Sequence, residues 1–506
     1  MNRENWASNL FLFGLAVMAI SLPFSEFGMS QAQFILAGAW LLRGKYVHDL
    51  KKVFRHPIAL GLIVLYFIHV VFLVNTSDFA YAFKDLRIKL PLLLLPLFIF
   101  SFELPSKKTL HLFSLLFIAA VFVASIIASI KLNMGNSGGD FNSRDASVFI
   151  SHIRFSLMVC MSIVLLFHFW KNDELHSLLA WIFIVWFFIF LILLQSLTGI
   201  IILLAWGLAT LIYSMSRLNK KGVIVFTFVG AAFIFIYAFQ LYRSVFIYAP
   251  AVPGEATYTP TGNRYEHTDL KDCENGQPVF QFLCHQELAE IWLRKNNFDS
   301  TYLSDQHYIT LLRYMTSKGL KKDSTSFKQL LESDLKNIRD GIPNFQYVEM
   351  FPIHKRLYET TWELYMYRLY NRAGGHSFTQ RFEYWSTGLK ILKNNFFFGV
   401  GTGDIALAYT EQYNTDKSFL KEKYRLRSHN QYLSFAIAFG IIGFIVAMIF
   451  LIRPLFMIEY QKAIYLSFML IGLLSFVNED TLETQAGVSF FAFFYCFSAL
   501  LAKIYK

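Results

Sequence analysis

Long apolar segments alternate with short polar ones over most of the chain. About twelve stretches are rich in Leu, Ile, Phe, Val and Ala and nearly free of charge, and several approach the ~20 residues that a helix needs to cross a bilayer. These stretches are 7–24, 26–42, 57–75, 88–102, 109–131, 148–169, 177–194, 197–215, 222–241, 431–452, 463–478 and 485–503. The pattern predicts an all-α polytopic membrane protein with about twelve transmembrane helices.

Composition supports the same class. The 506 residues are 55% hydrophobic and 18% aromatic, with a mean hydropathy of +0.42, and soluble proteins rarely reach such values. The net charge of +11 could indicate nucleic-acid binding. However, the basic residues lie between apolar segments and form no separate basic domain, which argues against that function. The first apolar stretch lacks a small-residue cleavage site, so we expect it to be retained.

The distribution of Lys and Arg predicts the orientation. Among the short loops, one alternate set holds most of the basic residues, and such loops are usually cytoplasmic. They contain Arg3, Arg43, Lys45, Lys51, Lys52, Arg55, Lys107, Lys108, Lys171, Arg217, Lys220, Lys221, Arg453, Lys462, Lys503 and Lys506. We therefore expect an inner-membrane protein with both termini in the cytoplasm and residues 242–430 in the periplasm.

Residues 242–430 differ in composition from the rest of the chain. They hold most of the charged residues, and stretches such as 285–296, 326–339 and 345–371 have helical patterns. The segment is too long for a plain connector. We therefore predict a membrane domain at 1–241 with about nine transmembrane helices, a helical periplasmic domain at 242–430, and a second membrane domain at 431–506 with about three.

Four cysteines are present, and two of them lie in the predicted periplasmic domain. Cys273 and Cys284 could form a disulfide in an oxidising compartment, but spacing alone does not fix their separation. A bridge and two free thiols both remain open. Cys160 and Cys496 lie in apolar stretches and are expected to be buried side chains.

Several cationic groups lie on the side that the positive-inside rule disfavours. They are Lys84, Arg87, Lys89, Arg144, Arg154, Arg381, Arg425 and Arg427. Their presence indicates an anionic ligand, and we favour a diphosphate headgroup over ordinary lipid phosphate. No Asp-x-Asp pair or His/Cys cluster has metal-ligand spacing, so we expect no metal and no cofactor. The acidic sequence NEDTLE at 478–483 could bind a ligand, but we interpret it as a solvated turn.

Two short motifs refine the candidate site. Ser428 and Gln431 have the spacing of a capping box, which makes His429 the first helical residue and a candidate general base. Ser377 and Gln380 repeat this spacing and place Arg381 in the first turn of a helix. Trp385 would share a helix face with Arg381. The glycine-rich residues 399–404 are interpreted as a turn after that helix.

The sequences QRFEYWSTGLKILKNNFFFGVGTGD and RSHNQYLSFAIAFG bring these motifs together. With the layout of twelve helices and one large loop between the ninth and tenth, they resemble the O-antigen ligase family. That family includes O-antigen polymerases and protein O-oligosaccharyltransferases. The resemblance is specific over 378–444. The family's His-x10-Gly motif corresponds to His429 and Gly440, and its Arg-x3-Leu motif to Arg381, although Trp385 stands where Leu is usual.

The resemblance implies a GT-C-like membrane fold and a metal-independent glycosyltransferase. Such an enzyme moves a glycan from undecaprenyl diphosphate to an acceptor hydroxyl, a lipid A core sugar in a ligase, with inversion at the anomeric carbon. His429 and Arg381 would be catalytic. The diphosphate would be bound by Arg427, Arg425, Arg87 and Arg154. Trp385 and Gly440 would be structural, Gly440 by forming a small-residue packing face with Ala436.

Three alternatives remain at this point. A polymerase of the family would use the same donor with a second lipid-linked glycan as acceptor. A protein O-oligosaccharyltransferase would use a Ser or Thr hydroxyl. A transporter of lipid-linked glycans would need polar residues across both leaflets, whereas these cations lie on one side. Neither the sugar nor the acceptor can be read from the sequence.

Overall fold

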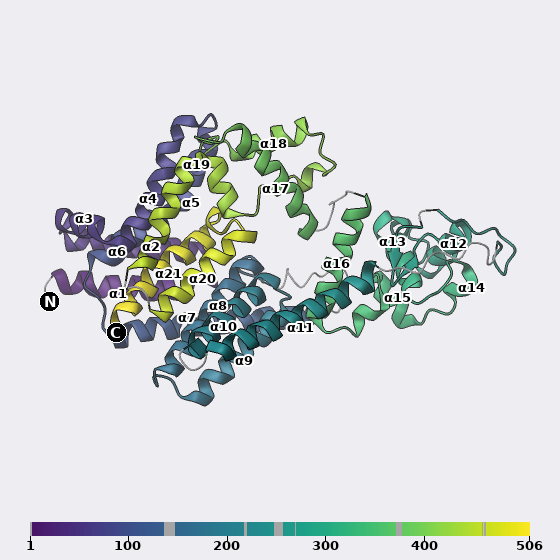
Figure 1. Ribbon diagram of the computed structural model, residues 1–506, viewed down its shortest axis with the longest axis horizontal. Coiled ribbons are helices and arrows are strands. Elements are labelled where there is room, and N and C mark those ends of the chain that lie inside the picture. The colour runs from purple at the N-terminus through teal and green to yellow at the C-terminus, as the bar shows by residue number, and fades with distance from the viewer. Residues whose placement is uncertain are drawn as a thin grey trace. The chain divides into compact units, whose positions relative to one another are not determined.

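The computed structural model describes residues 3–135, 147–216, 220–246, 257–268, 270–370, 377–457, 459 and 462–505. These residues are mostly helical (Figure 1), with one short antiparallel hairpin formed by β1 (Cys273–Glu274) and β2 (Gln277–Pro278). The all-α prediction is confirmed. Contacts divide the chain into two compact units. The first unit comprises Met1–Lys131, Ser143–Leu211 and Gln380–Lys506, and the second comprises Leu132–Asn142 and Ile212–Thr379.

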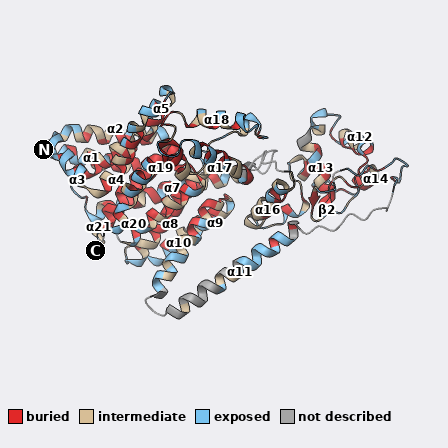
Figure 2. Ribbon diagram, turned by 45° about the horizontal axis from the view of Figure 1, so that its top comes forward, coloured by how far each residue is buried: buried red, intermediate tan, exposed pale blue. Residues whose placement is uncertain are grey.

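Most of the apolar helices belong to the first unit. Wholly or for most of their length, the helices of this unit are α1 (Arg3–Ser21), α2 (Glu26–Arg43), α3 (Tyr46–Arg55), α4 (Pro57–Val71) continued by η1 (Phe72–Asn75), α5 (Phe79–Lys89), α6 (Pro91–Ser101), α7 (Lys107–Gly135), α8 (His152–Lys171), α9 (Ser177–Leu193), α10 (Leu197–Ser216), α17 (Ser377–Asn394), α18 (Ile405–Thr415), α19 (Gln431–Ile452), α20 (Ala463–Asn478) and α21 (Gln485–Ile504). Buried residues fill its interior (Figure 2).

Within the described residues, six helices are long and apolar enough to cross a membrane. They are Pro57–Asn75, Lys107–Leu132, His152–Lys171, Leu197–Ser214, Gln431–Phe456 and Gln485–Ile504. Ser177–Leu193 and Ala463–Asn478 are apolar but shorter. The chain is thus an all-α membrane protein, and the total of about twelve transmembrane helices remains a prediction.

Contacts between helix ends define two opposite faces of the first unit. The start of α1 contacts the end of α2, because Arg3 donates to the Leu42 carbonyl. The end of α21 contacts the start of α4, because Lys503 bonds to His56. We call this the terminal face. The starts of α2, α8 and α21 meet at the other end, the far face, through Gln485 to the Glu26 carbonyl and Arg154 to Glu479. Both chain ends therefore lie on the face opposite to the start of α21.

Helix α19 is interrupted at Gly440, where φ is 61° and ψ is −176°. The loop after α17 fills the break. The Ile441 amide donates to the Phe396 carbonyl at 2.8 Å, and two loop amides donate to carbonyls of α19 that precede the break. The backbone groups freed by the break thus find partners, as a membrane environment requires. A Cβ on Gly440 would lie 2.2 Å from the Phe397 oxygen. Gly440 therefore packs against a loop, in place of the expected small-residue helix contact.

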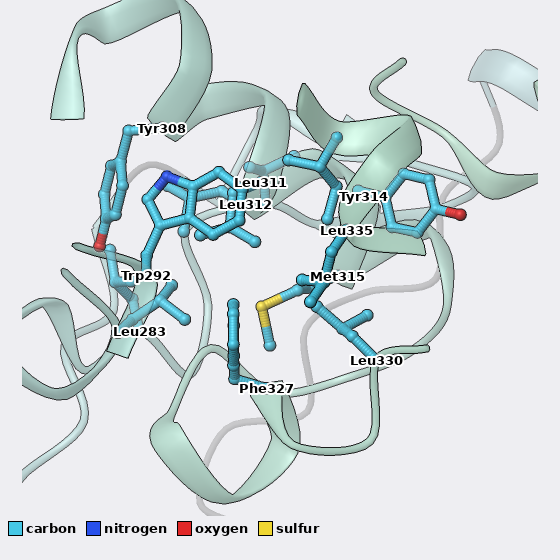
Figure 3. Close-up of a cluster of buried hydrophobic side chains, with 13 residues drawn as sticks. Leu283, Trp292, Tyr308, Leu311, Leu312, Tyr314, Met315, Phe327, Leu330 and Leu335 are labelled. Carbon is cyan, nitrogen blue, oxygen red and sulfur yellow. The ribbon is translucent and has the colours of Figure 1, made fainter. Parts of the chain in front are cut away.

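The second unit contains α11 (Lys220–Phe246), α12 (His285–Lys295), η3 (Ser300–Leu303), α13 (Asp305–Ser317), α14 (Ser324–Phe327), α15 (Glu332–Arg339), η4 (Phe345–Val348), α16 (Pro352–Tyr370) and the β hairpin. Trp292, Leu311 and Met315 are fully buried in its core (Figure 3). Cys273 and Cys284 are both buried, and the Cys273 thiol donates to the Leu270 carbonyl at 3.7 Å. The units divide the chain differently from the predicted domains, because residues 380–430 cluster with the apolar helices and α11 clusters with the polar segment.

Candidate functional site

The acidic turn between α20 and α21 lies at the centre of the candidate site. Glu479, Asp480 and Glu483 are only 3%, 4% and 8% exposed. The interpretation of this sequence as a solvated turn is therefore wrong. Buried carboxylates need cations or hydrogen-bond donors, because an unpaired buried charge is strongly destabilising. The turn at the far face obtains these partners from five other segments of the chain.

Asp480 holds the loop that precedes α19. Its carboxylate accepts hydrogen bonds from the Ser434 hydroxyl at 2.9 Å, from the Ser428 hydroxyl at 3.3 Å and from the His429 amide at 3.2 Å. Burial raises the pKa of Asp480, and Arg427 opposes that rise. These bonds fix the backbone of His429 in the left-handed region, with φ at 47°.

The start of α19 differs from the predicted capping box. The helix begins at Gln431, and the N-cap is Asn430, whose side chain accepts from the Leu433 amide at 2.9 Å. Ser428 is bound to Asp480 and Ser434 instead, so its hydroxyl does not cap the helix. His429 thus precedes the helix, and its position depends on the acidic turn and not on the positive end of α19.

The His429 side chain faces Glu479. The distance from His429 Nδ1 to Glu479 Oε1 is 3.8 Å, and Nδ1 has no hydrogen-bond partner among the described residues. The Tyr384 ring lies beside the imidazole, with 5.7 Å between ring centroids. About a third of the side chain, 31%, remains exposed. The imidazole is therefore held between Glu479 and Tyr384, while part of it remains accessible.

Glu479 is also paired with Arg154 on α8, with 2.9 Å between Nη2 and Oε1. Burial raises the pKa of this carboxyl, but His429 and Arg154 together lower it below its ordinary value. The group is thus ionised at neutral pH. A carboxylate beside Nδ1 favours the proton on that nitrogen and leaves Nε2 as the basic atom.

Glu483 organises a second set of contacts. Its carboxylate accepts from Arg427 at 3.0 Å, from Lys89 at 3.0 Å and from the side-chain Nε2 of Gln431 at 3.1 Å. Despite burial, Lys89 and Arg427 hold the pKa of Glu483 below its ordinary value. Lys89 also donates to Asp85 at 2.6 Å, and burial raises the pKa of Asp85 to about 6. The contacts join α5, the loop before α19 and the acidic turn.

Arg381 reaches the same turn from α17. Its Nε donates to the Asn478 carbonyl at 3.3 Å. The helix already includes Ser377, so Arg381 lies in its second turn and not in the first, and the position before Ser377 is outside the described residues. Trp385, one turn further, donates from Nε1 to the Ser428 carbonyl at 2.9 Å. Trp385 thus links α17 to the loop that holds His429.

Two predicted arginines lie elsewhere. Arg425 donates to the Leu420 carbonyl at 3.0 Å and to Asn414 at 2.8 Å, and so stabilises its own loop. Arg87 is exposed on α5, whereas Lys89, two residues later, is 1% exposed and enters the network. Arg144 lies outside the described residues. Of the predicted site residues, the structure brings together His429, Arg381, Arg427 and Arg154.

The acidic partners of these cations were not predicted from the sequence. One usable signal was the spacing of Asp85 and Lys89, which are i,i+4 neighbours on a helix. A second was the presence of three acids directly before an apolar helix on the side that also held unexplained cations. Opposite charges on the same membrane side indicate an internal network as well as a ligand site.

We expect the Lys89→Met variant to be destabilised by about 3–5 kcal/mol, because Asp85 and Glu483 would lose the cation they share in a buried site. Thermal unfolding of the purified protein measures the loss. Lys84→Met on the same helix is the matched control, since Lys84 is exposed and its loss should change stability by about 0.5 kcal/mol or less. Equal melting temperatures for the two variants would contradict the assigned role of Lys89.

Comparison with known proteins bears on the same region. Residues 341–448 match the family model described as O-antigen ligase, which confirms the resemblance seen in the sequence. The matched segment includes Arg381, Trp385, Arg427, His429 and Gly440. No curated protein matches the chain. The chain thus contains a segment similar to the O-antigen ligase family model, within an all-α membrane protein.

Proposed function

We propose that this protein of the O-antigen ligase family transfers a glycan from undecaprenyl diphosphate to an acceptor hydroxyl at the periplasmic membrane face, and that the acceptor is a lipid A core sugar. One observation carries the proposal. His429 contacts the same buried acidic turn as Arg154, Arg381 and Arg427, and all of these residues except Arg154 lie in the segment that matches the family. A proton acceptor and several cations in one place suit a reaction that deprotonates a hydroxyl and releases a diphosphate.

His429 is the proposed base. The acceptor oxygen attacks the anomeric carbon, its proton passes to Nε2, and the bond from that carbon to the diphosphate oxygen breaks. Direct displacement inverts the anomeric centre. Glu479 beside Nδ1 would orient the ring and stabilise the imidazolium that forms. Such a pairing of base and carboxylate is a recurring arrangement in enzymes.

The arginines would stabilise the charge on the departing diphosphate. Guanidinium groups match phosphate oxygens in two-point contacts, and preorganised donors act most strongly where water is limited. Arg427 keeps 26% of its side chain exposed while Glu483 and Tyr81 hold it in place. Arg154 and Arg381 approach from α8 and α17. The proposal leaves Arg425 and Arg87 outside the site.

Glu479→Gln should lower the turnover number roughly 10–100-fold with little change in KM for the donor. Gln keeps the shape of the Glu479 side chain but removes the carboxylate beside His429 Nδ1. Initial rates with purified protein over a range of donor concentrations would measure both constants. Glu422→Gln, at an exposed position in the loop before α19, is the control. A change in KM alone would contradict the orienting role and indicate a role in donor binding.

A deletion strain distinguishes the family's reactions. Loss of a ligase leaves bare lipid A core and polymer accumulating on undecaprenyl diphosphate. Loss of a polymerase leaves a single repeat on the core. Loss of a protein glycosyltransferase leaves both glycolipids unchanged and removes glycan from proteins. Analysis of the extracted glycolipids therefore tests the ligase proposal, and only the first outcome supports it.

A further inference from the structure

Helix α3 was not among the predicted elements, and it is held at the terminal face by its polar side. Asp49, which is fully buried, pairs with Arg43 at the end of α2 at 3.3 Å. Lys52 donates to the Phe102 carbonyl, just beyond α6, at 2.9 Å. Val53 is also fully buried. Since α4 begins two residues after α3, this short helix lies where three apolar helices begin or end.

The outward side of α3 is apolar. Val47, Leu50 and Phe54 are exposed by 69%, 38% and 47%. They are three and four residues apart, so they form a single stripe along the helix. The helix also has four basic or acidic residues among its ten, which makes it too polar to cross a bilayer. A polar helix with an exposed apolar stripe, level with the ends of apolar helices, has the properties of an interfacial helix.

Two exposed cations lie next to the stripe. Lys51 and Arg55 have no hydrogen-bond or ion-pair partner among the described residues. The neighbouring basic residues are all engaged: Arg43 with Asp49, Lys45 with Glu4 and Lys52 with two carbonyls. Lys51 and Arg55 are four residues apart and therefore share one flank of the stripe. The surface thus offers two free positive charges beside a strip of hydrocarbon.

We propose that α3 binds anionic phospholipid headgroups at the terminal face, with Lys51 and Arg55 on the phosphate and the stripe of Val47, Leu50 and Phe54 against the upper acyl chains. The combination of charge and exposed hydrocarbon selects this occupant. A free anion would leave the apolar stripe uncovered. An acidic protein could cover the stripe only if α3 were lifted away from the membrane surface. Each basic residue near such a surface strengthens binding roughly fivefold. The inference concerns lipid and does not depend on glycan transfer.

Native mass spectrometry of the detergent-purified full chain, titrated with phosphatidylglycerol or with phosphatidylcholine, tests the inference. For the tightest-bound phosphatidylglycerol, the double variant Lys51→Gln/Arg55→Gln should bind roughly 25-fold more weakly than the unmodified chain. Phosphatidylcholine binding should be unchanged. The control is Lys417→Gln/Lys421→Gln, at exposed positions in the loop after α18, which should bind phosphatidylglycerol normally.

A second variant separates lipid from free phosphate. Val47→Gln/Phe54→Gln keeps both charges and removes the stripe, and should also weaken phosphatidylglycerol binding. If it binds normally, or if inorganic phosphate displaces the lipid, the site is a simple anion site and the proposal fails. Equal losses in the Lys417/Lys421 control would show a general charge effect and would also overturn it. All substituted residues are exposed, and gel filtration checks that each variant remains folded.

Discussion

His429→Ala should reduce glycan transfer by about 10²–10⁴-fold, the usual contribution of a general base. The protein should still accumulate and fold, because the side chain makes no described hydrogen bond and its amide contact with Asp480 belongs to the backbone. Transfer from a lipid-linked donor by purified protein measures the loss, and membrane abundance measures folding.

Two further variants make this result interpretable. His429 has a φ of 47°, where Ala is disfavoured by about 1–2 kcal/mol and Asn is better tolerated, so His429→Asn removes the base at a lower cost to the backbone. It should be as inactive as His429→Ala. His176→Ala, at an exposed position before α9, should keep full activity. Full activity of His429→Asn at normal abundance would remove His429 from the mechanism.

Gly440→Leu should destabilise the protein by roughly 2–5 kcal/mol, the sum of a left-handed backbone position and a steric overlap. The overlap is with backbone, since the new Cβ would lie 2.2 Å from the Phe397 oxygen. Backbone cannot move aside as a flexible side chain does. Because typical stabilities are about 5–15 kcal/mol, this is a large share of the total, and both the melting temperature and the amount of protein in the membrane should fall.

Gly207→Leu is the matched control for this prediction. No atom lies within 4 Å of the place where a Cβ on Gly207 would be, and the residue belongs to α10. This variant should accumulate normally, and thermal unfolding should show little change. Normal abundance and an unchanged melting temperature for Gly440→Leu would contradict the proposed contact between the break in α19 and the loop after α17.

The apolar helices could be predicted because their signal is local. A run of apolar residues is helical in a membrane whatever surrounds it, since its backbone groups must bond to one another. The break in α19 could not be predicted in this way. Gly440 lies in an apolar run, and its conformation depends on residues 396–401, which contact it only after folding.

The candidate site could be predicted in part. Charge on the side expected to be disfavoured by the positive-inside rule selected Arg154, Arg381, Arg427 and His429, which the structure brings together. Charge could not decide whether Arg87 or Lys89 belongs to the site, because both are cations. They lie two residues apart on a helix and therefore on nearly opposite faces, so only one of them can point into the site. The three acids of the turn were interpreted as solvated because charge alone does not show whether a side chain is buried. Their burial depends on cations contributed by α5, α8 and the loop before α19.

Transfer by the purified chain with a defined donor tests the central claim most directly. The reaction contains an undecaprenyl-diphosphate-linked glycan and lipid A core, and the glycan product and released carrier diphosphate are measured together. If His429 is the base for direct transfer, the unmodified chain should give equal amounts of both products and His429→Asn should give neither above background. Release of diphosphate without glycan on the acceptor, or equal transfer by both proteins, would contradict it.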